Sequence, residues 1–217
     1  MILAAHQPNF LPNLAYFKKM LMSDIFVIIT NIQFEKHEGW QQRHKIPGPS
    51  NDIWLTVPVL GSQTQLIRDV KINNSINWRK KHSRTLDLLY KNKAGNNFIK
   101  EFDDIYLKYW ERLADINIAM ILAIKDILQI RTPVVIDEEV SGVKHNLLIN
   151  VCKKYNADTF LSGHGAKSYL STEKLAEIEE HKLSHVYVKK DLSSMYPYST
   201  IHYLLSEGRE FVSGIIK

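Results

Sequence analysis

The first thirty residues alternate between short apolar runs and a segment with helical spacing. Residues 2–5 form an apolar run that predicts a buried strand. Apolar side chains then recur at three- and four-residue spacing through residues 11–21, with Pro12 in the expected first turn of a helix. A β-branched and aromatic run at 25–30 is typical of a strand buried on both faces. This order predicts a βαβ unit with parallel strands and a right-handed crossover.

The alternation of strand and helix patterns continues along the rest of the chain. Residues 31–52 are polar and predict a long loop. Residues 98–127 predict one long helix or two consecutive ones, the second capped by Asp115. Further strands are predicted at 53–59, 66–72, 133–136, 159–161 and 185–188, and further helices at 78–90, 146–155 and 200–207. We expect a single α/β domain over residues 1–217, with a mostly parallel sheet and a helical subdomain around residues 78–130.

Composition narrows the class of protein only slightly. Of 217 residues 45% are hydrophobic, enough for a core, and no run approaches the ~18 apolar residues of a membrane span. Cys152 is the only cysteine, so no intrachain disulfide forms. With no secretory signal pattern at the N-terminus, the expected location is the cytoplasm. The net charge of +5 suits an anionic ligand such as a nucleotide, or serves solubility alone.

Polar side chains follow each of the first two predicted strands. His6, Gln7 and Asn9 come after the first strand, and ligands of open parallel sheets bind beyond the carboxyl ends of strands. A histidine there can act as an acid, a base or a phosphate partner, or it can be hydrogen-bonded in a structural turn. Gln33 follows the second strand and offers a donor and an acceptor to a base, amide or hydroxyl, or is an ordinary loop residue.

Two clusters of basic residues contain a tryptophan, and a third stretch contains two glycines. The basic clusters could bind phosphate or RNA, or form solvated surface with the tryptophan in the core. Their candidate residues are Arg43, Lys45, Trp78, Lys81 and His82. Ser162, Gly163 and Gly165 follow a predicted strand and could form an anion cradle or a tight turn. They do not match the P-loop pattern, and no GxSxG elbow occurs in the sequence. No CxxC pair occurs either, so no metal site is predicted.

Taken together, these motifs resemble the WbqC-like family of bacterial proteins over nearly the whole chain. The family's opening is similar to His-Gln-Pro-x-aromatic-x-Pro-Trp-Leu-Gly-Tyr-Phe, and here Asn13 replaces the tryptophan and Ala15 the glycine. The matching stretches are His6-Gln7-Pro8, Tyr16-Phe17, Asp24-Ile25-Phe26-Val27, Gln33-Phe34, Trp40, Arg43-x-Lys45-Ile46, Trp54-Leu55-Thr56-Val57-Pro58-Val59, Trp78-x-x-Lys81-His82 and Thr159-Phe160-Leu161-Ser162-Gly163-x-Gly165.

This resemblance implies a role in surface-polysaccharide biosynthesis, such as that of O-antigen in lipopolysaccharide. It implies the tailoring of a nucleotide-linked amino sugar by transfer of an amino acid, such as glycine, to the sugar amine. A more distant similarity is to pantothenate synthetase and related nucleotidyltransferase-type domains, and it implies a Rossmann-like three-layer fold. Those enzymes activate a carboxylate with ATP. Asn9 stands in place of the second histidine of their His-x-Gly-His motif, which weighs against adenylation here.

The leading hypothesis is therefore a glycyl transferase or an ATP-dependent amide ligase. The donor is an adenylate made from ATP or an aminoacyl-tRNA. The alternatives are a non-catalytic nucleotide or nucleotide-sugar binding protein that assists a pathway enzyme, and an RNA-binding protein. The predicted catalytic residues are His6 and His82, and the predicted substrate- or nucleotide-binding residues are Gln7, Asn9, Gln33, Arg43, Lys45, Trp78, Lys81, Ser162, Gly163 and Gly165. The oligomeric state is left open.

Overall fold

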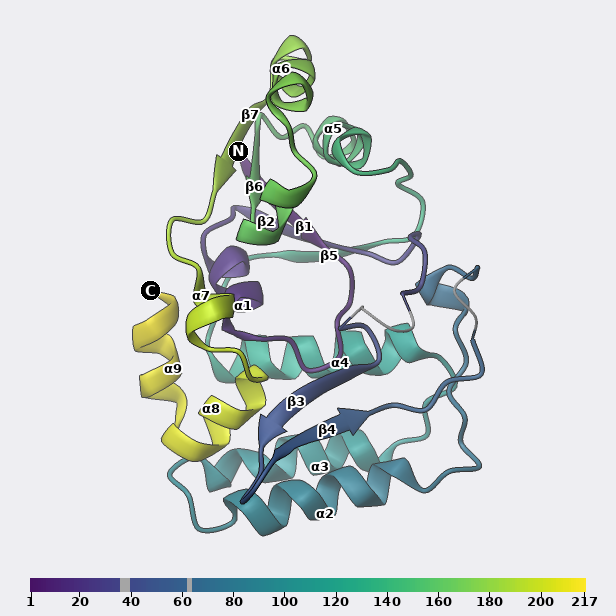
Figure 1. Cartoon of the computed structure of the whole chain (residues 1–217), viewed down its shortest axis with the longest axis vertical. Helices are drawn as coiled ribbons and strands as arrows, with labels where there is room; N and C mark the ends of the chain where they lie inside the picture. Colours follow the sequence, from purple (N-terminus) through teal and green to yellow (C-terminus); the bar gives the residue numbers. More distant parts are fainter. Residues whose placement is uncertain (36–39, 62–63) are drawn as a thin grey trace.

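A parallel sheet forms the upper half of the molecule in Figure 1. The computed structural model describes residues 1–35, 40–61 and 64–217. The sheet has five strands in the order β5-β2-β1-β6-β7, and all neighbouring strands are parallel. Its strands are β1 (Ile2–His6), β2 (Ile25–Ile29), β5 (Val134–Asp137), β6 (Thr159–Ser162) and β7 (Ser184–Tyr187). The predicted α/β class and Rossmann-like three-layer fold are confirmed.

The strand order reverses direction between β1 and β6. The chain runs outward from β1 through β2 to β5, and then returns to place β6 and β7 on the other side of β1. In open α/β sheets, ligands bind outside the carboxyl ends of the strands at such a switch point. A ligand-binding site is therefore expected at the carboxyl end of β1.

Helices cover both faces of the sheet, and alternate side chains of each strand point to opposite faces. Helices α5 (His145–Lys154) and α6 (Thr172–Glu180) pack against the face that carries Leu3 and Phe160. Helix α1 (Leu14–Leu21) packs against the face that carries Ala4 and Leu161. The core on the α1 side is larger than the core on the α5 side, because it continues into the lower half of the molecule.

The lower half contains an antiparallel hairpin and most of the remaining helices (Figure 1). The hairpin consists of β3 (Arg43–Pro47) and β4 (Asp52–Thr56). The helices are α2 (Trp78–Tyr90), α3 (Ile99–Leu107), α4 (Leu113–Ile127), α7 (Leu192–Met195), α8 (Thr200–Glu207) and α9 (Arg209–Ile216), with short 3-10 turns η1 (Ile67–Asp69), η2 (Asn96–Phe98) and η3 (His164–Ser168). In the described ranges, no helix combines the length and the apolar character needed to cross a bilayer.

The C-terminal part of the chain is bonded to the loop after β1. The hydroxyl of Ser199 donates to the carbonyl of Leu11 at 2.7 Å, and the amide of Thr200 donates to the carbonyl of Pro12 at 2.9 Å. The amide of Ser199 also donates to the carbonyl of Lys45 in β3 at 3.0 Å. Helix α8 therefore connects the loop after β1 to the hairpin.

Four local predictions are wrong. The 66–72 segment is not a strand, because its core-facing apolar residues lie around η1 and in single bridges. Residues 43–47, predicted as loop, form β3, because they pair with β4 in an antiparallel hairpin. Asp115 lies inside the first turn of α4, where Arg112 holds the cap position. Pro12 precedes α1, because its carbonyl is bonded to α8 rather than within a helical turn.

Candidate functional site

His6 lies at the end of the central strand, half-buried, on the face covered by α1. Its ring packs 4.8 Å from the ring of Tyr16, and its Nδ1 lies 3.0 Å from the carbonyl oxygen of Gln7. Because a carbonyl only accepts, Nδ1 carries the proton and Nε2 is left as an acceptor. Burial, together with the charge of Lys19, lowers the pKa of His6 to about 3. The imidazole is therefore neutral at neutral pH.

Lys19 of α1 is a functional candidate that the sequence analysis missed. Its side chain is 6% exposed, and its Nζ donates to the carbonyl of Ala5 at 2.9 Å. The Nζ also lies 5.8 Å from the ring centroid of Phe26. Burial lowers the pKa of Lys19 to about 7. The one sequence signal is that Lys19 follows Tyr16 by three residues, which places a lysine on the buried helix face.

Ser162 ends β6, next to β1, but its side chain lies on the opposite face of the sheet from His6. Continuing the register Leu3↔Phe160 places Ser162 beside Ala5, one residue before His6. The Ser162 hydroxyl is buried and hydrogen-bonds His185 Nε2 of β7 at 2.8 Å. The ends of β1 and β6 thus lie side by side, but the Ser162 hydroxyl and the His6 imidazole lie on opposite faces of the sheet. A ligand that contacts both must reach across the strand ends.

The glycines after β6 adopt ordinary backbone conformations. Gly163 has φ −77°, and a Cβ added to Gly163 or to Gly165 would meet nothing within 4 Å. The turn continues as the short η3, in which His164 Nε2 lies 2.7 Å from the carbonyl of Val188. Neither position needs a glycine, because neither has a positive φ and no other part of the described chain approaches closely. Their open surroundings fit a turn as well as an anion cradle.

The outer face of the β3–β4 hairpin carries an exposed aromatic and basic surface. Trp40 and Trp54 are 40% and 45% exposed, and their rings stack at 6.1 Å with 18° between planes. The guanidinium of Arg43 lies 4.6 Å from the Trp54 ring centroid. Lys45 is bonded to Asp52 at 2.8 Å, so its charge is locally compensated. Such stacked rings with a cation suit a planar base.

The predicted site residues of α2 do not share one exposed face. Lys81 is exposed, whereas Trp78 and His82 are buried and their rings lie 5.4 Å apart. His82 also packs 5.6 Å from Tyr106 and 5.9 Å from Phe10, and burial lowers its pKa to about 4. In the described chain, Trp78 Nε1, His82 Nδ1 and the Tyr106 hydroxyl have no hydrogen-bond partner. His82 is thus part of an aromatic core cluster.

The two remaining candidates, Asn9 and Gln33, lie in the segments that follow β1 and β2. Asn9 is buried, and its Oδ1 accepts no hydrogen bond from the described residues. Gln33 is exposed, and its backbone forms an isolated bridge with Leu66. Gln7 contacts His6 through its backbone carbonyl.

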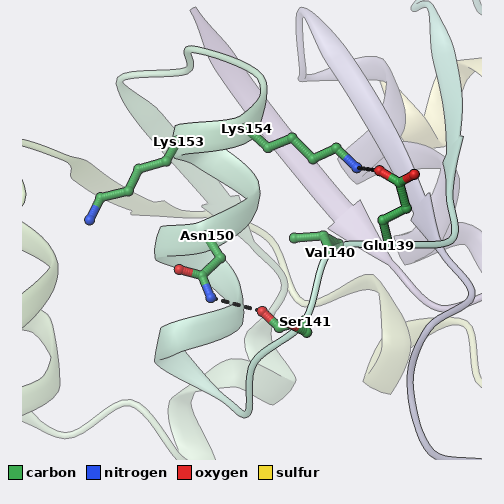
Figure 2. Close-up of a pocket in the computed structure, with 6 residues that line it drawn as sticks. All are labelled: Glu139, Val140, Ser141, Asn150, Lys153 and Lys154. Atoms are coloured by element: carbon green, nitrogen blue, oxygen red, sulfur yellow. Dashed lines mark hydrogen bonds and ion pairs between the residues drawn. The ribbon is translucent and has the colours of Figure 1, made fainter.

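A surface hollow of about 400 Å³ lies between α5 and the segment after β5 (Figure 2). It contains none of the predicted site residues. Lys154 is paired with Asp137 at 2.8 Å and with Glu139 at 3.0 Å, and Lys153 Nζ lies 3.2 Å from His181 Nδ1. Both lysines that line the hollow therefore already have protein partners. The hollow is better explained as part of the β5–α5 connection than as an anion-binding site.

The fold and the polar end of its central strand define a Rossmann-like α/β protein with a candidate site at the strand switch point. The WbqC-like protein family matches residues 7–203, and the chain belongs to this family. The chain is 30% identical over 180 residues to "Uncharacterized protein Rv1507c" of Mycobacterium tuberculosis (strain ATCC 25618 / H37Rv), covering 79% of this chain and 76% of that protein. No solved structure matches. Membership of the family suggests a role in polysaccharide-related biosynthesis.

Proposed function

We propose that the protein joins an activated amino acid, such as glycine, to the amine of a nucleotide-linked sugar in polysaccharide biosynthesis. The observation that carries the proposal is His6. It lies half-exposed at the carboxyl end of the central strand, at the switch point, with Nε2 available as an acceptor. Family membership supports the pathway.

The reaction needs an oriented amine more than a strong base. The sugar nitrogen attacks the carbonyl carbon of the activated amino acid, a C–N bond forms, and the C–O bond to the leaving group breaks. The proton lost by nitrogen ends on the leaving oxygen, which belongs to the phosphate of an adenylate or to the ribose of a tRNA. With its pKa lowered to about 3 by burial and by Lys19, His6 is a weak base whose Nε2 accepts a hydrogen bond from the amine and aligns it.

Replacing His6 with alanine is expected to lower turnover by ~10²-fold or more while the protein stays folded, because the amine loses its acceptor. The measurement is amide product by mass spectrometry, with UDP- or dTDP-amino sugars and either ATP and glycine or glycyl-tRNA. His181→Ala, which removes an exposed imidazole, is the matched control and should retain turnover. Wild-type turnover in His6→Ala would refute the proposal. Weaker sugar binding by a protein without turnover would identify the non-catalytic binding protein instead.

The hairpin surface favours aminoacyl-tRNA as the donor, because two stacked tryptophans with an arginine over one of them form a platform for unpaired bases. Trp54→Ala is expected to weaken binding of single-stranded RNA by ~5- to 150-fold, the worth of one base–aromatic stack. Fluorescence anisotropy at two salt concentrations measures it, with the exposed Leu107→Ala as control. If wild-type protein binds no RNA, or Trp54→Ala binds it equally well, ATP remains as the activating group.

A further inference from the structure

Helix α1 places one lysine among the residues that it buries against the sheet. Its buried residues are Leu14, Tyr16, Phe17, Lys19 and Met20. The Lys19 ammonium has three donors, and its hydrogen bond is to the carbonyl of Ala5. In residues 1–35, 40–61 and 64–217, no carboxylate lies within ion-pair distance of it. The charge is therefore not neutralised by the described protein.

Packing alone does not account for a lysine at this position. Burying an unpaired ammonium costs several kcal/mol, whereas an apolar side chain of similar length would fill the same space without that cost. The neighbouring Lys18 shows the ordinary arrangement, because it is half-exposed and donates to the backbone carbonyl of Lys217 at 3.0 Å. Groups that lower stability are commonly retained where function requires them.

The Lys19 ammonium lies near the carboxyl end of the central strand, because it is bonded to the carbonyl of Ala5. Ala5, His6 and Gln7 are each half-buried, although β1 is the middle strand of five. The ammonium is bonded to Ala5 and its charge acts on His6, so the two groups border the same strand end. A neutral acceptor and an uncompensated cation thus meet at the switch point, where ligands of this fold class bind.

We propose that Lys19 is the anion-binding residue of the site, and that its ammonium binds a phosphate or carboxylate oxygen of the substrate beside the end of β1. This deepens the proposed function and rests on it for the location of the site. The anionic oxygen belongs to the nucleotide of the sugar donor or to the amino acid. In either case the ligand supplies the negative charge that the protein does not.

Isothermal titration with UDP, ATP and glycine as separate probes tests the proposal in wild-type protein, Lys19→Met and Lys18→Met. Lys18→Met is the matched control, since it removes the same charge one residue away. We expect Lys19→Met to lose ~10-fold or more in affinity for the probe that wild type binds, the worth of one charge-assisted hydrogen bond. A loss for UDP and ATP assigns the subsite to phosphate, and a loss for glycine assigns it to carboxylate.

Two results would overturn the inference. One is equal affinity of Lys19→Met and wild type for every probe that binds, and the other is no binding of any probe to wild type at millimolar concentration. A melting temperature of Lys19→Met at or above that of wild type excludes misfolding as the cause of a loss. If His6→Ala abolishes turnover while Lys19→Met retains both affinity and turnover, the proposed function stands and the role of Lys19 falls.

Discussion

Lys19→Met is expected to increase the free energy of unfolding at pH 7 by ~1–4 kcal/mol, the range seen when apolar residues of similar volume replace buried ionic groups. The reason is that Lys19 is 6% exposed and its ammonium has no carboxylate partner in the described chain. Urea denaturation gives the free energy directly, provided that the slope with denaturant is unchanged. Lys18→Met should change it by less than ~0.5 kcal/mol, as is usual for surface substitutions.

The same substitution should alter the pH dependence of stability. Burial lowers the pKa of Lys19 to about 7 in the folded protein, whereas an unfolded chain has ~10.4. Below pH 7 both states hold the proton and the full cost of burying the charge is present. As pH rises toward ~10.4 only the unfolded chain holds it, so this contribution makes wild type more stable by up to ~1.4 kcal/mol per pH unit.

The advantage of Lys19→Met over wild type should therefore shrink as the pH is raised from 7. His6 stays neutral throughout this range, since its pKa is lowered to about 3. Destabilisation by Lys19→Met, or a constant difference between pH 7 and pH ~9, would contradict the account of a buried, uncompensated charge.

Asp137→Asn is expected to destabilise the protein by ~1.5–3 kcal/mol, the worth of hydrogen bonds to a charged group, because it removes the charge of a buried carboxylate. The carboxylate accepts from the Tyr155 hydroxyl at 2.6 Å and from the amides of Glu139 and Val140 at 2.8 and 2.7 Å, and it pairs with Lys154 at 2.8 Å. Burial alone would raise the pKa of Asp137, but these partners outweigh it and hold the pKa well below the usual range.

This contribution has its own pH range. The carboxylate stabilises the fold above the unfolded pKa of ~3.9, and the stabilisation is lost as the pH falls below it. Glu139→Gln is the matched control, because it removes the other, exposed partner of Lys154 and should cost less than ~1 kcal/mol. Chemical denaturation at pH 7 and pH ~2.5 compares the variants, because the contribution of the carboxylate is lost only below pH ~3.9. Equal stability of Asp137→Asn and wild type at pH 7 would show that the charge of the Asp137 carboxylate contributes nothing.

The sequence predicts most of the fold because burial follows hydrophobic periodicity. The runs at 2–5 and 25–30 mark β1 and β2, and the 78–90 and 200–207 patterns match α2 and α8 to the residue. The β3 strand escapes the sequence analysis because its alternation of Arg43, His44 and Lys45 is polar throughout, and its burial depends on pairing with β4. A pattern read along one chain does not show such pairing.

The candidate site is less accessible to sequence analysis, because its chemistry depends on which face a side chain occupies. His6 can be placed at a strand end from sequence, but its separation from Ser162 depends on the β1–β6 register. Lys19 is hidden because lysine next to Lys18 resembles a solvated pair. His185 is hidden because its bond to Ser162 joins residues 23 apart in sequence.

The bonds from Ser199 and Thr200 to the loop after β1 have a consequence for synthesis. Proteins emerge from the ribosome N-terminus first, at ~5–20 residues per second, so β1 is made well before α8. The carbonyls of Leu11 and Pro12 accept from residues that are synthesised much later, and Leu11 and Ser199 are 188 residues apart. The loop after β1 therefore forms its bonds to α8 only after nearly all of the chain has been made. A nascent chain that stops before α8 lacks these bonds, so the loop that follows His6 is held by fewer contacts.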